Sequence, residues 1–119
     1  MIKGIGLDIV EITRIKQAVS RNSRFVARVL TEKEMRIYDE FSSGKRQIEF
    51  LAGRFAVKEA FSKAVGQGIG KLSFQHIEVL PNAQGAPTVH VKGYEREQIF
   101  VSITHSEQYA VAQVIITHK

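Results

Sequence analysis

Two carboxylates occupy positions where the surrounding pattern favours an apolar or a small residue. Glu59 lies in the segment FAVKEAFSK, residues 55 to 63, and at about 100° per residue it shares one narrow arc of a helix with Ile48, Ala52 and Phe55. Asp8 lies in an alternating segment, on the face that also carries Gly4 and Gly6. Because an unpartnered buried carboxylate is costly, each of the two predicts a cation or hydrogen-bond donors nearby.

Binding of a divalent cation is the chemistry that this pair could support. The two glycines would let the strand approach a helix closely, so that Asp8 and Glu59 converge. One or two carboxylates, with phosphate oxygens and retained water, are the usual ligands of magnesium. Lys63, one turn after Glu59, would then meet a phosphate as a point charge. The alternative is an ordinary strand-end aspartate and a surface ion pair between Glu59 and Lys63, worth only about 0.3–0.5 kcal/mol.

Two further segments could contact an anion. His105 and Ser106 lie at a predicted turn, where they could bind phosphate or transfer protons, or could simply be solvated. No G-x-S-x-G motif accompanies them, so they do not form a hydrolase signature. The segment GQGIG, residues 66 to 70, follows a helix instead of preceding one, which favours helix termination over a phosphate-binding loop.

Four arginines recur at helical spacing near the N-terminus. On a continuous helix, Arg14, Arg21, Arg24 and Arg28 form one strip about 80° wide. Without interleaved aromatic residues, such a strip suits an acidic helix or a phosphate backbone better than stacked bases. The alternative is a solvated charged face.

The elements that must position these residues are strands and helices in an α+β order. The apolar periods and the turn residues predict a strand over residues 2 to 10 and then a helix from Arg14 to about Leu30, with a break near Asn22. A short helix should follow the capping box of Thr31 and Glu34, and a longer helix, apolar on two sides, should run from about Lys45 to Val65. Strands are predicted over residues 74 to 80 and 87 to 93, followed by a C-terminal hairpin that turns near residues 105 to 107.

Length and composition limit the class of protein. A chain of 119 residues with 44% hydrophobic residues predicts a single domain over residues 1 to 119. The absence of cysteine excludes disulfides, thiolate nucleophiles and cysteine-based metal sites. No segment has the pattern of a membrane span or a signal peptide, so we expect a soluble, cytoplasmic protein. The net charge of +5 indicates an anionic partner: nucleic acid, a phosphorylated small molecule or an acidic protein.

Three motifs together resemble one known family. GIGLDIVEITRI near the N-terminus, FLAGRFAVKEAFSKA about fifty residues later and VSITHSEQYAVA near the C-terminus are similar to the motifs of the bacterial holo-acyl-carrier-protein synthases, the small trimeric 4'-phosphopantetheinyl transferases. The resemblance covers essentially the whole chain. It implies an antiparallel sheet packed against a long helix, in a trimer with sites between subunits.

The resemblance also implies a reaction. The 4'-phosphopantetheine group of coenzyme A is transferred to a serine of apo-acyl carrier protein, which releases adenosine 3',5'-bisphosphate and supports fatty acid biosynthesis. Asp8 and Glu59 match the ligands of magnesium, with manganese as an alternative metal. Lys63 matches a lysine that steadies the phosphates, and Lys58 lies beside it in the K-E-A core as a second cofactor-binding residue. Glu59 and a magnesium-bound water are the candidate bases.

The remaining implied contacts involve other chains. His105 matches a histidine that contacts coenzyme A from a neighbouring subunit. Arg14, Arg21, Arg24 and Arg28 fall where the family presents a basic helix to the acidic carrier protein. Neither nucleic acid nor a membrane is expected as a partner. Two rival functions remain: a small nucleic-acid-binding module, which predicts an exposed aromatic platform on a sheet, and a metal-dependent phosphohydrolase, which would attack with water.

Overall fold

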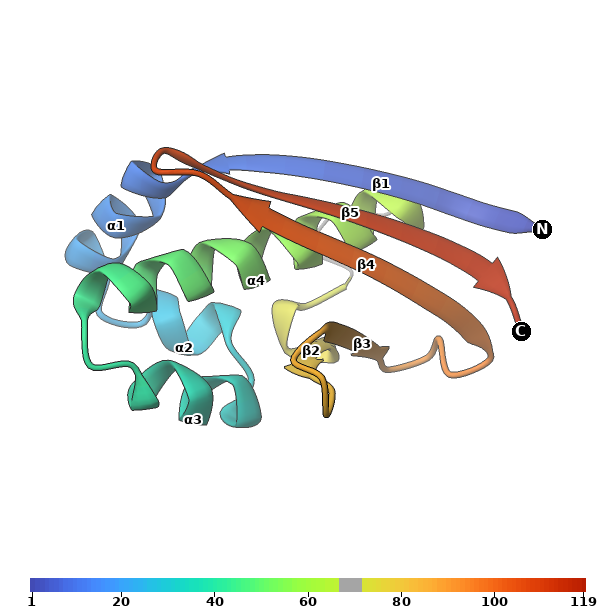
Figure 1. The fold of residues 1–119 in the computed structure, drawn as a ribbon. Coiled ribbons are helices and arrows are strands. Elements are labelled where there is room, and N and C mark those ends of the chain that lie inside the picture. Colours follow the sequence, from blue (N-terminus) through green and yellow to red (C-terminus); the bar gives the residue numbers. More distant parts are fainter. Residues whose placement is uncertain (67–71) are drawn as a thin grey trace.

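The computed structural model describes residues 1–66 and 72–119, which form an α+β fold (Figure 1). In chain order the elements are β1 (Ile2–Glu11), α1 (Ile12–Arg21), α2 (Phe25–Val29), α3 (Glu32–Glu40), α4 (Gly44–Ala64), the 3-10 helix η1 (Phe74–His76), β2 (Ile77–Pro81), β3 (Pro87–Val91), β4 (Glu97–His105) and β5 (Tyr109–His118). The predicted fold class is therefore confirmed. Apart from Gly66, the GQGIG segment lies outside the described residues.

The strands form two antiparallel sheets. The larger sheet has the order β1-β5-β4, so the first and last strands of the chain are neighbours, and the smaller sheet is the β2-β3 hairpin. α4 packs under the larger sheet (Figure 1). α2, α3 and the β2-β3 hairpin lie on the side of α4 that faces away from this sheet. This arrangement explains why the sequence of α4 is apolar on two faces.

Local sequence signals set several of the helix boundaries. Ser43 caps α4 by accepting a hydrogen bond from the Arg46 backbone amide at 3.1 Å. The chain after α4 turns at Gly66, whose φ of 75° is a conformation that favours glycine. The break near Asn22 and the capping box of Thr31 and Glu34 are both confirmed.

The strand predictions were less accurate at their ends. Residues 74 to 76 form η1 instead of the start of a strand, because the Ser73 hydroxyl accepts a hydrogen bond from the Gln75 amide and begins a helical turn. The C-terminal hairpin turns between His105 and Tyr109, as expected. No helix within residues 1–66 and 72–119 is long and apolar enough to cross a membrane.

β1 and α4 touch through their backbones. A β-carbon added to Gly6 would collide with the carbonyl oxygen of Ala60, and one added to Gly4 would collide with that of Ala64. Any side chain larger than hydrogen would therefore push the strand away from the helix. The close approach predicted from the two glycines is confirmed.

The opposite face of the larger sheet is open and carries exposed apolar side chains. The side chains of Ile5, Leu7 and Ile9 on β1 are 57%, 58% and 62% exposed, and Phe100 on β4 is 51% exposed. The strand register places Ile115 of β5 between Ile5 and Phe100, so these three side chains form one apolar row across the sheet, whereas Leu7 lies level with the polar Gln113 of β5 and Ser102 of β4. We call this surface the open sheet face.

Candidate active site

The closest contact among the predicted site residues joins Asp8 and Lys63. The Lys63 ammonium nitrogen lies 2.9 Å from Oδ1 of Asp8 and 3.2 Å from the carbonyl oxygen of Leu7. The Asp8 side chain is only 12% exposed because β1 packs on α4, whereas Lys63 is 54% exposed at the end of the helix. Lys63 therefore pairs with a residue from another element, and the alternative of a simple pair with Glu59 is wrong.

Glu59 lies one helical turn before Lys63 and faces the same carboxylate. Partial burial raises the pKa of Glu59, the negative charge of Asp8 raises it further, and the charge of Lys63 opposes both effects. The charges on Asp8 and Glu59 thus lie near enough to influence each other. The predicted convergence of residue 8 and residue 59 is present in the fold.

The donor set at this point suits a hard divalent cation. The two carboxylates supply oxygen ligands, and Asp8 already binds one positive charge, the ammonium of Lys63. No cluster of three or more His, Cys, Asp or Glu side chains that could hold a metal is found among the described residues. Two carboxylates alone fit magnesium, which usually takes its other ligands from water and substrate phosphates.

Lys58 is the correction to the predicted set. Its side chain is 0% exposed, and its ammonium contacts Oε1 of Glu34 and the carbonyl oxygen of Val29, each at 2.6 Å, and that of Phe74 at 3.2 Å. Burial lowers the pKa of Lys58, and the carboxylate of Glu34 opposes this shift. All three donors are used inside the protein, so Lys58 has no free donor for a cofactor phosphate.

Glu34 completes this buried pair. Its carboxylate also accepts hydrogen bonds from the backbone amides of Thr31, at 2.8 Å, and Val79, at 2.7 Å. The Lys58–Glu34 pair thereby connects α4 to the start of α3, the end of α2 and strand β2. A structural role explains both residues.

His105 lies at a different place from the two carboxylates. Asp8 is level with Ala112 of β5 and Ile103 of β4, so β5 separates β1 from the strand that ends in His105. His105 Nδ1 is 3.9 Å from Oε2 of Glu49, near the start of α4. A single chain does not bring His105 to Asp8, and the prediction that it serves a neighbouring subunit stays a prediction.

Two arginines near His105 were missed by the sequence reasoning. Arg46 and Arg54 line a pocket of about 180 Å³ together with His105. The guanidinium carbon of Arg54 lies 4.1 Å from the ring centroid of Phe50, and its Nε is buried without a hydrogen-bond partner. Arg54 stands inside the motif FLAGRFAVKEAFSKA, and a charged residue among these apolar neighbours was the available signal.

The four N-terminal arginines are exposed, but they do not lie on one helix. Arg14 and Arg21 belong to α1, Arg24 directly precedes α2, and Arg28 lies within α2. The premise of a continuous helix is therefore wrong. α2 packs on α4 through the rings of Phe25 and Phe55, whose centroids are 6.2 Å apart.

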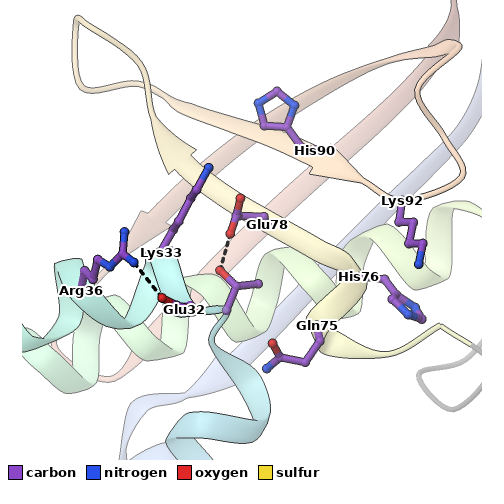
Figure 2. A pocket seen from close by; sticks show the side chains of 9 residues that line it. Glu32, Lys33, Arg36, Gln75, His76, Glu78, His90 and Lys92 are labelled. Carbon is purple, nitrogen blue, oxygen red and sulfur yellow. Dashed lines mark hydrogen bonds and ion pairs between the residues drawn. The ribbon is translucent and has the colours of Figure 1, made fainter.

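A hollow of about 480 Å³ beside α3 contains none of the predicted site residues. Figure 2 shows its polar side chains, which come from α3, η1 and the β2-β3 hairpin: Glu32, Lys33, Arg36, Gln75, His76, Glu78, His90 and Lys92. Arg36 is paired with Glu32 at 2.7 Å, and Glu78 accepts a hydrogen bond from Thr31. We therefore place the candidate site at the contact of β1 and α4.

The fold and this site define an α+β protein with two carboxylates and a lysine suited to phosphate groups and a divalent cation. The chain belongs to the 4'-phosphopantetheinyl transferase superfamily, whose family model matches residues 4–114. It is 52% identical over 116 residues to a holo-[acyl-carrier-protein] synthase of Oceanobacillus iheyensis, which covers 98% of this chain and 97% of the relative. A holo-[acyl-carrier-protein] synthase of Listeria innocua is 55% identical over 117 residues, or 98% of each chain.

Solved structures give the same family. The holo-(acyl-carrier-protein) synthase of Bacillus anthracis in complex with CoA (3',5'-ADP) has a TM-score of 0.92 and 44% identity, covering 100% of this chain and 99% of that one. The Helicobacter pylori enzyme in complex with coenzyme A has a TM-score of 0.83 and 35% identity, covering 95% and 99%. The resemblance seen in the three sequence motifs is confirmed.

Proposed function

We propose that this protein transfers the 4'-phosphopantetheine group of coenzyme A to a serine of apo-acyl carrier protein. The serine oxygen bonds to the phosphorus next to pantetheine, the bond from that phosphorus to the adenosine bisphosphate breaks, and the serine proton leaves to a base. The observation that carries the proposal is the convergence of Asp8, Glu59 and Lys63 in a chain 52% and 55% identical to relatives named for this activity. The holo-carrier product then supports fatty acid biosynthesis.

Each residue of the site has a separate task in this reaction. Asp8 and Glu59 would hold magnesium, with manganese as an alternative. A bound divalent ion would neutralise the negative charge that develops on the leaving phosphate. Lys63 binds the same phosphates as a point charge. Glu59 and a magnesium-bound water are the candidate bases for the serine proton, because a metal lowers the pKa of its water.

Coenzyme A is the proposed phosphopantetheine donor. Support comes from the relatives of Bacillus anthracis and Helicobacter pylori, whose structures are described as complexes with coenzyme A. The net charge of +5 also suits a substrate that carries several phosphates. A cytoplasmic location stays our prediction, since the protein must meet both coenzyme A and the carrier protein.

A homotrimer of single-domain chains, each spanning residues 1–119, is the proposed assembly. The open sheet face supports association, because contiguous exposed apolar surface usually marks an interface. In such a trimer, His105, Arg46 and Arg54 of one subunit would supply positive groups to the coenzyme A bound at Asp8 and Glu59 of the next. This arrangement would explain why His105 lies across the sheet from Asp8 within one chain.

The acyl carrier protein is proposed to dock on the exposed arginines Arg14, Arg21, Arg24 and Arg28. All four are solvent-exposed, and they lie on consecutive helices at one end of α4. A cluster of positive charge steers an acidic partner and raises the association rate. The break after Arg21 means that the two pairs of arginines meet the carrier from two helices.

Mass spectrometry of the carrier tests the function directly. The protein is incubated with coenzyme A, magnesium and apo-acyl carrier protein, and the expected result is a carrier heavier by one phosphopantetheine group. An unchanged carrier mass would contradict the proposal. Release of phosphopantetheine or phosphate from coenzyme A with an unmodified carrier would favour the phosphohydrolase.

The nucleic-acid-binding alternative gains no support from the sheet. Phe100 is exposed among aliphatic side chains, whereas the ring of Tyr94 packs edge-on against Phe61 with centroids 5.1 Å apart. Phe74 packs against Phe55 with centroids 5.5 Å apart. The exposed Tyr109 of β5 lies six residues along that strand from Ile115, the register partner of Phe100, so the described strands do not group aromatic rings into a platform for stacked bases.

A further inference from the structure

The ammonium of Lys63 contacts Asp8, one of the two carboxylates proposed to hold the metal. It is 2.9 Å from Oδ1 of Asp8, although Glu59, its neighbour one turn earlier on the helix, is also a carboxylate. The carbonyl oxygen of Leu7, at 3.2 Å, holds the same ammonium. The Lys63 side chain therefore reaches from α4 to β1, where its charge neutralises the carboxylate of Asp8.

Charge balance requires some cation at this point. Asp8 and Glu59 repel each other, which is one reason that the pKa of Glu59 is raised, and the positive charge of Lys63 opposes the effect. A divalent ion bound to both carboxylates would take over this neutralisation. An ammonium and a divalent ion on the same Asp8 oxygens would repel each other strongly at that distance.

Lys63 is free to leave without disturbing the fold. Its side chain is 54% exposed, whereas Asp8 is 12% exposed and fixed by the packing of β1 on α4. The flexible four-carbon stem of a lysine can move its ammonium to a nearby phosphate while the helix stays in place. The exposed lysine is thus the movable partner and the aspartate the fixed one.

We propose that the ammonium of Lys63 neutralises Asp8 while the metal site is empty. When a metal binds, this ammonium moves from Asp8 to a phosphate of coenzyme A. The inference rests on the proposed function and deepens it. In the metal-free protein the ammonium holds Asp8; the divalent ion displaces it; and the released ammonium binds phosphate. Metal and coenzyme A therefore each strengthen the binding of the other, by the same factor.

Direct measurement of manganese binding, without coenzyme A or turnover, tests the exchange. Free Mn²⁺ is followed by electron paramagnetic resonance in titrations of the wild type, Lys63→Met and Asp8→Asn. Because the competing ammonium is removed, Lys63→Met should bind Mn²⁺ about 1.4- to fivefold more tightly, the range for a partly exposed ion pair. Asp8→Asn should lose the site. In the wild type, adding coenzyme A should tighten Mn²⁺ binding, and in Lys63→Met this gain should shrink.

Lys33→Met is the matched control. It removes the same charge from an exposed lysine on α3, which lines the hollow in Figure 2 and contacts neither carboxylate. Its Mn²⁺ affinity should stay close to that of the wild type. If Lys33→Met tightens binding as much as Lys63→Met does, net charge explains the effect and the exchange is wrong.

The remaining outcomes separate this inference from the proposed function. Unchanged or weaker Mn²⁺ binding by Lys63→Met, with binding still lost in Asp8→Asn, overturns the counter-ion role and leaves the metal site intact. Binding that Asp8→Asn does not affect overturns both the metal site and the exchange. Circular dichroism of each variant checks that the fold is retained.

Discussion

At the scale of single residues, Glu59 combines a proposed role in metal binding with a cost in stability. Its carboxylate is partly buried beside that of Asp8, and both effects raise its pKa. We expect Glu59→Gln to keep the fold and to abolish transfer of phosphopantetheine, because the variant loses a metal ligand and a base while keeping the same shape. Carrier mass spectrometry measures the loss, and full activity in Glu59→Gln would show that the assignment is wrong.

The same substitution should reveal the pKa shift in the metal-free protein. A carboxyl whose folded pKa is raised contributes stability that is complete below its unfolded pKa, near 4.5, and is lost as the pH rises through its folded pKa. Glu59→Gln should therefore unfold at a higher temperature than the wild type at pH 8. The difference should disappear as the pH falls toward 4.5. A constant difference across this range would contradict the shift.

Lys58 is expected to affect stability far more than a surface lysine. Lys58→Met leaves the Glu34 carboxylate buried without its cation, which typically costs about 3–5 kcal/mol. The matched control is Lys45→Met, since Lys45 pairs with Glu107 at 3.2 Å on the exposed surface, where a pair is worth about 0–1 kcal/mol. Urea unfolding compares the two variants. Equal losses would mean that the Lys58–Glu34 pair is not a structural connection.

At the scale of elements, the contact of β1 with α4 depends on Gly6. In Gly6→Ala the new methyl group meets the carbonyl oxygen of Ala60, and we expect a loss of at least about 1–3 kcal/mol together with weaker Mn²⁺ binding. Gly44→Ala is the control: a β-carbon there meets nothing within 4 Å, and alanine at a helical position should stabilise by about 0.4–1 kcal/mol. If both variants behaved alike, the close backbone contact would not set the site.

The helices α1 and α2 carry the predicted carrier surface. Reversing charge in Arg14→Glu or Arg21→Glu should raise the KM for the carrier protein severalfold and change that for coenzyme A much less, with the difference shrinking at high salt. Arg36→Glu is the control, because Arg36 is exposed on α3 and pairs with Glu32. Steady-state kinetics with each substrate varied gives both constants. Equal effects on the two constants would assign the arginines to the nucleotide.

The elements also show what sequence patterns could predict. The close approach of β1 and the two-sided burial of α4 were predictable, because period-two and period-3.6 patterns report which faces are covered. The partner of Lys58 was not, because Glu34 lies 24 residues away on another helix and only the tertiary fold brings them together. The phosphate role of Lys63 was predicted from its place one turn after Glu59 and from the resemblance, whereas its contact with Asp8 needed the structure.

At the scale of the whole molecule, the open sheet face should decide the oligomeric state. Leu7→Asp places a charge in the middle of this face, and we expect it to convert the proposed trimer to monomers and to reduce transfer sharply. Ala27→Asp, at an exposed apolar residue on α2, should leave the trimer intact. Light scattering gives the mass of each species. A monomeric wild type at assay concentrations would contradict the proposed assembly.

The sequence could predict the apolar side of β1 but not what covers it. Alternation placed Ile5, Leu7 and Ile9 on one face, and the glycine face was the one that met the helix. A pattern within one chain contains no information on a surface that a second chain would cover. The same limit applies to His105, whose position across the sheet from Asp8 becomes meaningful only if subunits associate.

The backbone contact between β1 and α4 has a consequence for how this protein can change over evolution. The spacing of the two carboxylates depends on a main-chain contact between Ala60 and Gly6, a position where no side chain fits, more than on the sizes of core side chains. Substitutions elsewhere in the core can then accumulate without moving Asp8 relative to Glu59. A small protein of this kind can therefore accept changes among its core side chains while the geometry of Asp8 and Glu59 stays the same.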